Sequence, residues 1–362
     1  MSVAPRLVAL ATAVPPEVVR QEDARTLIAH LFADAIGPDM RLIEVFDHAE
    51  ISTRHVCMPL EWFASDHDFA EKNGLYLEHA VRLAAEATRR VLDRAGLAPR
   101  DVDHLVYVSS TGLATPSVDA HLANLLGLRS DVRRTPIWGL GCAGGAVGLS
   151  RARDFALAQP SARILLIALE LCSLTFQRND LSKRNLVATS LFADGAAAAL
   201  IAGADAESPR ANGHRKLDVL DSQSTLWPDT LDVMGWNVDG RGLHVVFSRD
   251  IPSIVRDRVR PSLLAFLEAN RLELETLDHL VAHPGGAKVL RAYGETLGLP
   301  APALRHARQV LRDYGNMSSP TCLFVLERFL ESGDIAAGHT AVVAALGPGF
   351  SSEYVLLRGG QG

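Results

Sequence analysis

The chain has 362 residues, of which 48% are hydrophobic and 22% are charged, enough to bury one large core or two ordinary ones. Its formal net charge is −6 and it has no block of Lys or Arg, which argues against nucleic-acid binding through a basic face. The cysteines form no CxxC pair and no metal-like spacing with histidine; they are Cys57, Cys142, Cys172 and Cys322. This usage predicts reduced thiols, a cytoplasmic protein and no metal site.

The N-terminal segment "MSVAPRLVALATAVPPEVV" has two possible interpretations. One Arg, a short apolar run and an Ala-x-Ala are features of a secretory signal. The basic region is weak, however, and the run alternates into Pro15 and Pro16 as a strand does when it enters a turn. We therefore expect a strand here. No apolar run reaches the ~18 residues of a membrane span, so we expect no membrane span.

Farther along, the chain repeats itself. "VLDRAGLAPRDVDHLV" at 91–106 and "FLEANRLELETLDHLV" at 266–281 align without a gap, and each reads as a helix that leads into a short apolar strand. "GCAGGA" from Gly141 and "GNMSSPT" from Gly315 follow at nearly the same offset. Each opens a predicted helix and a further apolar strand; the helices are 145–159 and 319–333, and the strands are 162–170 and 339–347. Three correspondences in register predict an internal duplication.

The alternation of strands and helices predicts two α/β halves with mostly parallel sheets covered by helices. The polar segment 203–216 is the predicted join. The predicted halves are residues 1–205 and 214–362. Two similar halves usually pack face to face about a pseudo-twofold axis, so that corresponding turns meet. This packing would bring Cys142, His283 and the turn that carries Asn316 close to one another.

Cys142 lies at the mouth of a glycine-dense turn, with five glycines between Gly139 and Gly148. These glycines leave the thiol uncovered, and the helix that follows directs its positive end at the sulfur. A helix N-terminus lowers a thiol pKa from about 8.5, and a neighbouring imidazolium lowers it further. The pattern predicts a nucleophilic thiolate near pH 7. The alternative is a small buried apolar residue, the role that we assign to the other three cysteines.

His283 and Asn316 are the candidate partners of this cysteine. His283 ends the apolar strand "LDHLVAH", at the carboxyl end of a strand, where open α/β sheets hold their ligands. His279 lacks this placement, and its repeat partner His104 indicates a structural role. Asn316 precedes a predicted helix, where an asparagine is most often a cap. Its amide can also donate into an oxyanion hole, and the sequence leaves both roles open.

The segments "GCAGGAVGL", "ELCSLTFQ", "LFADGAAA", "AHPGGAKVL", "YGNMSSPT" and "LGPGF" together resemble the type III polyketide synthases, the chalcone-synthase-like branch of the thiolase superfamily. The resemblance covers nearly the whole chain. It implies the five-layered αβαβα thiolase fold built from two duplicated halves, and a homodimer. It also implies malonyl-CoA and acyl-CoA as substrates, without a metal or redox cofactor. Cys142 would hold the acyl chain, and His283 and Asn316 would decarboxylate malonyl-CoA.

The resemblance implies further site residues. Phe192 in "LFADG" is similar to the family's gatekeeping phenylalanine at the cavity mouth. The loop that would shape the cyclisation pocket comprises Gly347, Pro348, Gly349 and Phe350. Arg54 and Lys288 fall where the family contacts coenzyme A, and a cation there suits its phosphates. A solvated surface charge is the alternative for both.

Two departures bear on the substrate. Val245 stands where plant chalcone synthases carry a second phenylalanine, and Thr115 where they place a methionine that reaches across the dimer. Both are more similar to bacterial enzymes that take medium- or long-chain fatty acyl starters and release alkylpyrones or alkylresorcinols.

Three other functions remain as alternatives. A ketoacyl synthase III-like enzyme would condense once onto a carrier protein, and consumption of free malonyl-CoA would distinguish it. A non-catalytic thiolase-fold partner subunit usually loses the cysteine, whereas this chain keeps Cys142, His283 and Asn316. A cysteine hydrolase uses the same three residue types, but the duplication argues against it.

Overall fold

The computed structural model describes residues 4–33, 42–207, 215–248 and 251–361. Its strands are β1 (Arg6–Ala13), β2 (Glu17–Arg20), β3 (Thr53–Val56), β4 (His104–Val108), β5 (Arg133–Ile137), β6 (Arg163–Leu171), β7 (Asp194–Ala202), β8 (Leu217–Leu226), β9 (Met234–Asp239), β10 (Gly242–Phe247), β11 (His279–Ala282), β12 (Thr340–Gly347) and β13 (Ser351–Gly359). Its α-helices are α1 (Gln21–Leu31), α3 (Glu44–Asp47), α4 (Phe69–Ala95), α5 (Val118–Leu126), α6 (Gly144–Ala158), α7 (Lys183–Leu191), α8 (Ile251–Ile254), α9 (Arg260–Ala269), α10 (Ala287–Leu297), α11 (Arg305–Tyr314) and α12 (Thr321–Ser332).

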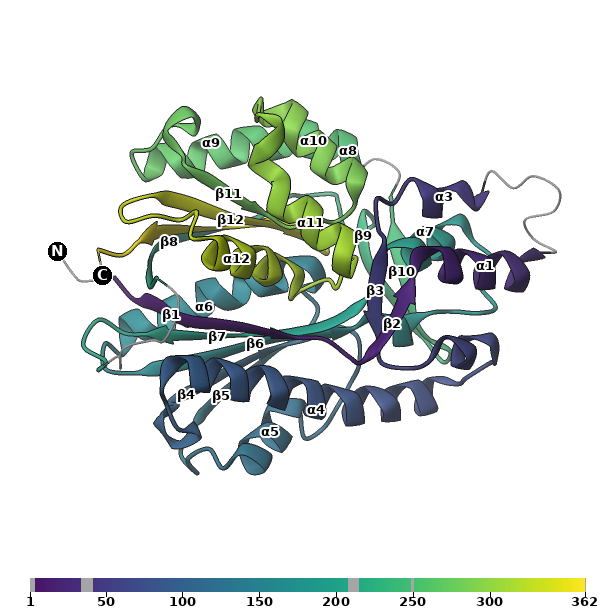
Figure 1. Ribbon diagram of the computed structural model, residues 1–362, viewed down its shortest axis with the longest axis horizontal. Helices are drawn as coiled ribbons and strands as arrows, with labels where there is room; N and C mark the ends of the chain where they lie inside the picture. The colour runs from purple at the N-terminus through teal and green to yellow at the C-terminus, as the bar shows by residue number, and fades with distance from the viewer. Residues whose placement is uncertain (1–3, 34–41, 208–214, 249–250, 362) are drawn as a thin grey trace.

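Helices and strands alternate in five layers, which Figure 1 shows from bottom to top. Helices α4 and α5 cover the strands of the first half, α6 and α12 form the middle layer, and α9 and α10 cover the strands of the second half. This is the predicted αβαβα arrangement. The strand predicted near the N-terminus is β1, in the centre of the sheet. The predicted join at 203–216 lies partly outside the described residues.

The strand order confirms the duplication. The nine-stranded sheet has the order β11-β12-β13-β8-β1-β7-β6-β4-β5. Outward from its centre, the first half runs β1-β7-β6-β4 and the second runs β8-β13-β12-β11. In both halves the first two pairings are antiparallel and the third is parallel.

The expectation of mostly parallel sheets is wrong. Three pairings in the sheet are parallel and five are antiparallel. Strands β12 and β13 are joined by a short loop, and a loop of that length permits only an antiparallel return. The sheets of the two halves also join at their edges, where Arg6 and Leu7 of β1 pair with Asp218 and Leu217 of β8.

Close packing of helix α6 explains two of the glycines near Cys142: Gly145 faces the start of α12, and Gly148 faces strand β6. A Cβ atom on Gly145 would lie 2.2 Å from the carbonyl oxygen of Ser319 and 2.8 Å from the Cys322 sulfur. A Cβ atom on Gly148 would lie 2.4 Å from the Leu166 side chain. Only glycine permits these approaches, so Gly145 serves the packing of α6 on α12 and Gly148 its packing on β6, whereas Gly139 and Gly141 form the turn itself.

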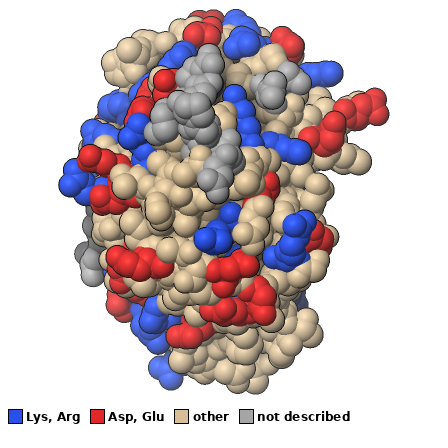
Figure 2. All heavy atoms as spheres, turned by 90° about the vertical axis from the view of Figure 1, so that its right-hand side faces the viewer, with Lys and Arg blue, Asp and Glu red and all other residues tan. Residues whose placement is uncertain are grey.

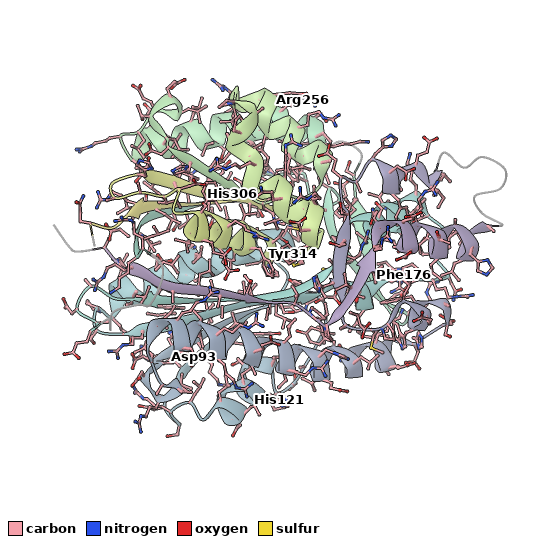
Figure 3. The ribbon with its side chains drawn as sticks, viewed as in Figure 1. Asp93, His121, Phe176, Arg256, His306 and Tyr314 are labelled. Atoms are coloured by element: carbon pink, nitrogen blue, oxygen red, sulfur yellow. The ribbon has the colours of Figure 1, made fainter. Side chains whose placement is uncertain are left out.

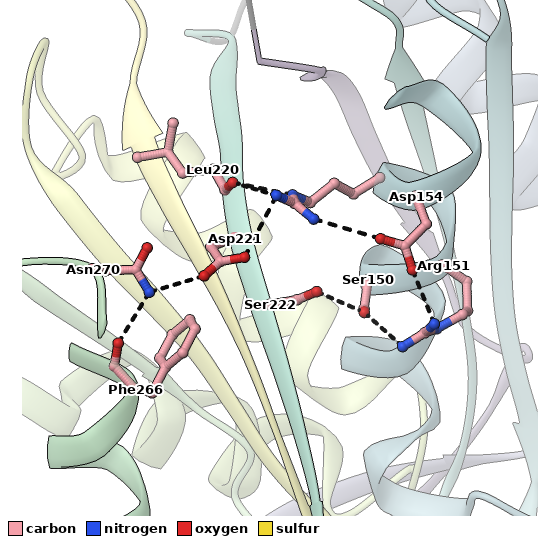
Figure 4. A network of polar contacts seen from close by, with 9 residues as sticks. Ser150, Arg151, Asp154, Leu220, Asp221, Ser222, Phe266 and Asn270 are labelled. Carbon is pink, nitrogen blue, oxygen red and sulfur yellow. Dashed lines mark hydrogen bonds and ion pairs between the residues drawn. The ribbon is translucent and has the colours of Figure 1, made fainter. Parts of the chain in front are cut away.

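Polar contacts also tie the central helix α6 to the second half (Figure 4). Ser150 and Ser222 on β8 share a hydrogen bond of 2.8 Å, and Arg153 donates to the Leu220 carbonyl at 2.6 Å. Asp221 accepts in turn from Asn270 at the end of α9. These contacts link three layers across the boundary between the halves.

The face at the right of Figure 1, turned towards the viewer in Figure 2, carries Lys and Arg among Asp and Glu rather than one continuous basic surface. Phe176, labelled in Figure 3, lies on this side of the molecule and packs with Phe32 at the end of α1. Among the described residues, no helix is both long and apolar enough to cross a bilayer.

Candidate active site

One cavity of about 900 Å³ contains all three predicted catalytic residues. Cys142 belongs to the short turn Gly141–Ala143 directly before α6, His283 follows β11, and Asn316 follows α11. These segments lie far apart in the sequence and come from both halves. The structure therefore brings the three side chains into one space, as the duplication predicts.

The turn that carries Cys142 is held from two sides. The backbone N–H groups of Gly139 and Gly141 both donate to the Ser110 hydroxyl at 3.2 Å. On the other side lies the "LGPGF" loop: a Cβ atom on Gly347 would lie 2.6 Å from Ala143 Cβ, and one on Gly141 would lie 2.9 Å from the Pro348 ring. The loop thus packs against the turn that carries Cys142 and stabilises it.

Leu346, which precedes this loop, lines the cavity, whereas the four predicted loop residues do not. Gly349 has a φ of 68° and donates its N–H to Met234, another lining residue. Phe350 is fully buried and packs on Trp227. The influence of Gly347, Pro348, Gly349 and Phe350 on cyclisation stays a prediction. Such an influence would be indirect, through neighbouring residues that line the cavity.

Burial controls the ionisation of Cys142. The side chain is 8% exposed, and desolvation raises the pKa of Cys142 to about 11. The buried Glu170 carboxyl raises that pKa further, while the Ser318 and Asn316 side chains act in the opposite direction. The sequence predicts a thiolate at pH 7 from the helix N-terminus and a neighbouring imidazolium. Burial opposes both parts of this prediction, because it raises the pKa of Cys142 and lowers the pKa of His283 to about 3.

Glu170 is a residue that the sequence reasoning missed. It is fully buried at the end of β6, and burial raises its pKa to about 7. Its carboxylate accepts from the Ser110 N–H and the Thr111 hydroxyl, each at 2.8 Å. Through Ser110 it supports the turn of Cys142. A Glu at the buried end of an apolar strand was the available sequence signal.

His283 is 4% exposed, and burial lowers its pKa to about 3, so the imidazole is neutral at pH 7. Neither ring nitrogen has a hydrogen-bond partner among the described residues. A buried imidazole that lines a cavity with both nitrogens unpaired can donate with one and accept with the other when a substrate arrives.

The orientation of Asn316 is fixed by its neighbours. Its Oδ1 accepts from the Ser318 N–H at 2.8 Å, and its Nδ2 donates to the Gly285 carbonyl at 3.2 Å. The N-cap position of the helix that follows is occupied by Pro320, so Asn316 is not its N-cap residue. An amide NH₂ has two donors, which leaves one N–H for a ligand in the cavity. The sequence leaves open whether Asn316 is a helix cap or a hydrogen-bond donor in an oxyanion hole. The geometry favours the donor role.

A second, smaller cavity of about 70 Å³ contains Phe192 and Val245. Phe192 packs against Trp236 and Phe247, with ring centroids 6.1 and 5.7 Å apart. Val245 and Trp236 are paired across the β9–β10 hairpin and line the same cavity. Phe247 lines the catalytic cavity, so Phe192 lies where the two cavities approach each other.

Helix α7 separates the two cavities, because its two faces line different spaces. The catalytic cavity is lined by Lys183, Arg184, Val187, Ser190 and Leu191. The smaller cavity is lined by Asn185, Ala188, Thr189 and the following Phe192. These two sets alternate at helical spacing, so the helix is a partition wall.

The prediction that Arg54 contacts CoA phosphates is wrong. Arg54 is 4% exposed, and its guanidinium donates to backbone carbonyls at the end of α7. Burial lowers its pKa to about 10, with the nearby Asp194 acting in the opposite direction, so it stays charged at pH 7. A sequence shows the charge at this position but not that the strand turns it inward.

Lys288 is exposed at the rim of the catalytic cavity, together with Lys183 and Arg184, which the sequence reasoning missed. All three are free to meet an anionic group of a ligand entering the cavity. Thr115 is also exposed but lies outside both cavities of this chain. Its predicted role across a dimer stays a prediction.

Comparison with known proteins decides the family. The N-terminal domain of chalcone and stilbene synthases matches residues 3–206, and their C-terminal domain matches residues 218–360. The chain belongs to the chalcone and stilbene synthase family. This confirms the resemblance to type III polyketide synthases on which the sequence prediction rested.

Three similar proteins come from bacteria. The 1,3,6,8-tetrahydroxynaphthalene synthase of Streptomyces peucetius is 42% identical over 97% of this chain and 92% of its own. The alpha-pyrone synthesis polyketide synthase-like Pks18 of Mycobacterium tuberculosis is 32% identical over 96% and 89%. The crystal structure of the Streptomyces coelicolor tetrahydroxynaphthalene synthase, a bacterial type III polyketide synthase, superposes with a TM-score of 0.91 at 30% identity, covering 98% of this chain and 99% of that one.

Proposed function

We propose that this type III polyketide synthase extends a medium- or long-chain fatty acyl-CoA with malonyl-CoA and closes the product to an alkylpyrone or alkylresorcinol. The observation that carries the proposal is the pair of cavities: a catalytic one with Cys142, His283 and Asn316, and a largely apolar one behind Phe192. The first, of about 900 Å³, supplies the chemistry and most of the space, and the second, of about 70 Å³, would take only a short end of an alkyl chain.

The loading step uses Cys142 and His283. The imidazole accepts the proton of the Cys142 thiol as the sulfur attacks the thioester carbonyl of the acyl-CoA. The bond between the acyl carbon and the CoA sulfur breaks, and the departing CoA thiolate takes the proton back from the imidazolium. The acyl chain is then held on Cys142, with its alkyl end free to lie along Phe192 and Val245.

The extension step uses His283 and Asn316. Malonyl-CoA loses CO₂, and the electron pair of the broken bond forms a thioester enolate. One N–H each from His283 and Asn316 stabilises the enolate oxygen. The carbanion carbon attacks the Cys142 thioester, a carbon–carbon bond forms, and the thiolate leaves. Decarboxylation drives the step, so CoA thioesters serve as substrates without a further cofactor.

The entrance is consistent with coenzyme A. Lys183, Arg184 and Lys288 at the rim can bind its phosphates, in the place that the sequence assigned partly to Arg54. We further propose a homodimer, in which the exposed Thr115 and the neighbouring exposed Leu113 are covered.

A second candidate is a synthase that uses malonyl-CoA alone and makes tetrahydroxynaphthalene. The relative from Streptomyces peucetius, at 42% identity, favours it. Such an enzyme starts from a malonyl unit, which has no alkyl chain to fill the apolar cavity.

Product mass spectrometry separates the two candidates. The enzyme is incubated with malonyl-CoA, alone and with acyl-CoA starters of increasing chain length. We expect alkylpyrones or alkylresorcinols whose mass follows the starter. A product that forms equally without a starter would support the second candidate, and no malonyl-CoA consumption without a carrier protein would support a ketoacyl synthase.

A further inference from the structure

The end of helix α7 bears on both cavities at once. Ser190 and Leu191 line the catalytic cavity, while Thr189 and Phe192 line the apolar one. The last carbonyls of a helix have no partner within the helix and need donors from elsewhere. The donor that binds these carbonyls therefore helps to fix the position of α7 between the two cavities.

That donor is Arg54 on β3, a strand from the N-terminal part of the chain. One of its terminal nitrogens donates to the Thr189 carbonyl at 2.5 Å and to the Phe192 carbonyl at 3.0 Å. The other donates to the Ser190 carbonyl at 2.9 Å. A single planar guanidinium thus holds three carbonyls in the last turn of α7, an arrangement that suits its fork of donors.

Gln21 extends this contact towards the cavity mouth. Its Oε1 accepts from Arg54, and its Nε2 donates to the Ser190 carbonyl at 3.0 Å and the Phe46 carbonyl at 3.1 Å. Phe46 belongs to α3, which lines the catalytic cavity through Glu44 and Val45. The buried pair of Arg54 and Gln21 therefore joins the partition to the rim.

Asn316 is joined to the same segment only through its backbone, whose N–H donates to the Leu191 carbonyl and whose carbonyl accepts from Ala193. Its side-chain amide is held by Ser318 and Gly285, which lie outside residues 188–193. A change at Arg54 would therefore shift the Phe192 side chain more than the Asn316 amide.

We propose that Arg54 is a positioning residue for starter selection: by holding the last turn of α7 it fixes Phe192 between the two cavities and so sets which acyl chains enter the apolar one. The selection of chains rests on the proposed function; the fixing of α7 does not. Arg54 touches no substrate in this role and acts through Phe192.

The test variant is Arg54→Lys. A lysine keeps the positive charge near Asp194 but replaces the planar fork by one ammonium group, which cannot reproduce all three contacts. The matched control is Arg94→Lys. Arg94 also donates to a backbone carbonyl, that of Leu10, and to the Glu327 carboxylate, and it lines neither cavity.

The first measurement is hydrogen–deuterium exchange, which does not depend on activity. In Arg54→Lys we expect amide exchange in residues 188–193 to become about tenfold faster, because contacts made by a charged donor are lost. In Arg94→Lys this segment should exchange as in the wild type. Unchanged exchange of 188–193 in Arg54→Lys overturns the proposal.

The second measurement is kcat/KM over a series of acyl-CoA chain lengths, with malonyl-CoA decarboxylation followed in parallel. We expect Arg54→Lys to change the ratio between long and short starters at least fivefold, with decarboxylation changed less than twofold. A uniform loss with every starter and in decarboxylation overturns the selection role. If the wild type condenses no acyl-CoA at all, the proposed function fails, and selection with it, while the exchange experiment still decides the positioning of α7.

Discussion

At pH 7 the cavity holds a neutral thiol and a neutral imidazole, because burial raises the pKa of Cys142 and lowers that of His283. Neither group bears a charge alone in the low-dielectric cavity. A proton passed from sulfur to imidazole would create both charges together, and each would stabilise the other. In the proposed mechanism the nucleophile therefore depends on proton transfer from Cys142 to His283 rather than on the turn alone.

This dependence predicts the behaviour of a His283→Gln variant. Alkylation of Cys142 by iodoacetamide at pH 7 should become about 10²-fold slower, since the proton acceptor is gone. The remaining rate should rise with pH and level off only near the pKa of the Cys142 thiol, which burial raises to about 11. Peptide mass spectrometry of the labelled sites measures both. Cys172 and Cys322 serve as internal controls, and equal rates at Cys142 in the two proteins would contradict the prediction.

The division of labour predicts two further phenotypes. Cys142→Ala should abolish polyketide formation, because no acyl-enzyme can form, yet leave some CO₂ release from malonyl-CoA. Asn316→Ala should reduce CO₂ release itself by about 10²–10³, the usual effect of removing an oxyanion donor. Radiolabelled CO₂ and product are measured in the same reactions. Normal product from Cys142→Ala would exclude a covalent role for this cysteine.

Among single residues, the sequence predicted the proximity of those that lie within recognisable sequence motifs. Cys142, His283 and Asn316 each begin or end an element, and the duplication brings such positions together. Arg54 escaped a correct interpretation because a one-dimensional pattern does not say whether an arginine faces solvent or three carbonyls. Glu170 escaped because its partners, Ser110 and Thr111, are distant in sequence.

At the scale of elements, helix α7 and the β9–β10 hairpin form the surroundings of Phe192. Val245 lies opposite Trp236 in the hairpin, and both line the apolar cavity. Valine is smaller than phenylalanine by most of an aromatic ring. In the proposed function that space takes part of an acyl chain, and each buried methylene of the chain would contribute about 0.8 kcal/mol.

Val245→Phe should therefore move the optimal starter towards shorter acyl-CoAs in a protein that remains folded. The measurement is kcat/KM over a chain-length series, with a melting curve for each protein. Overpacking of an ordinary core position would instead cost about 1–3 kcal/mol and lower activity with all starters alike. An unchanged chain-length profile in a stably folded variant would remove Val245 from the cavity wall.

The helices after the two repeated turns were predictable almost to the residue, because glycine, apolar spacing and terminal signals agree. The sequence predicts 145–159 and 319–333, and the structure has Gly144–Ala158 and Thr321–Ser332. The direction of the strands was not predictable in the same way. Apolar runs show that a strand is buried, whereas its partner depends on long-range pairing.

At the scale of the whole molecule, a partly buried ion pair joins the two halves. Glu327 on α12 accepts from Arg94 on α4 at 2.6 Å and from Thr12 on β1 at 2.5 Å. Glu327 is 10% exposed at its side chain, and Arg94 is 32% exposed. The pair connects the second half to the first at residues that lie far in sequence from the segment 203–216, which joins the halves.

Glu327→Ala should lower the free energy of unfolding by about 2 kcal/mol, because the Arg94 guanidinium and the Thr12 hydroxyl lose their acceptor. Urea unfolding followed by circular dichroism measures the change. The matched control is Glu86→Ala, which removes an exposed pair with Arg90 on the same helix and should cost less than about 0.5 kcal/mol. Equal destabilisation by the two substitutions would contradict a stabilising role for the Glu327–Arg94 pair.

The edge pairing of β1 with β8 and the matching strand orders point to an ancestor half as long as the present chain. Two copies of that ancestor would have met where the halves meet now, each with one turn facing the other. After a fusion of the two genes, the two turns would have been free to diverge, so that one now carries Cys142 and the other Asn316. A symmetric assembly with two equivalent sites would thereby have become a single chain with one asymmetric cavity.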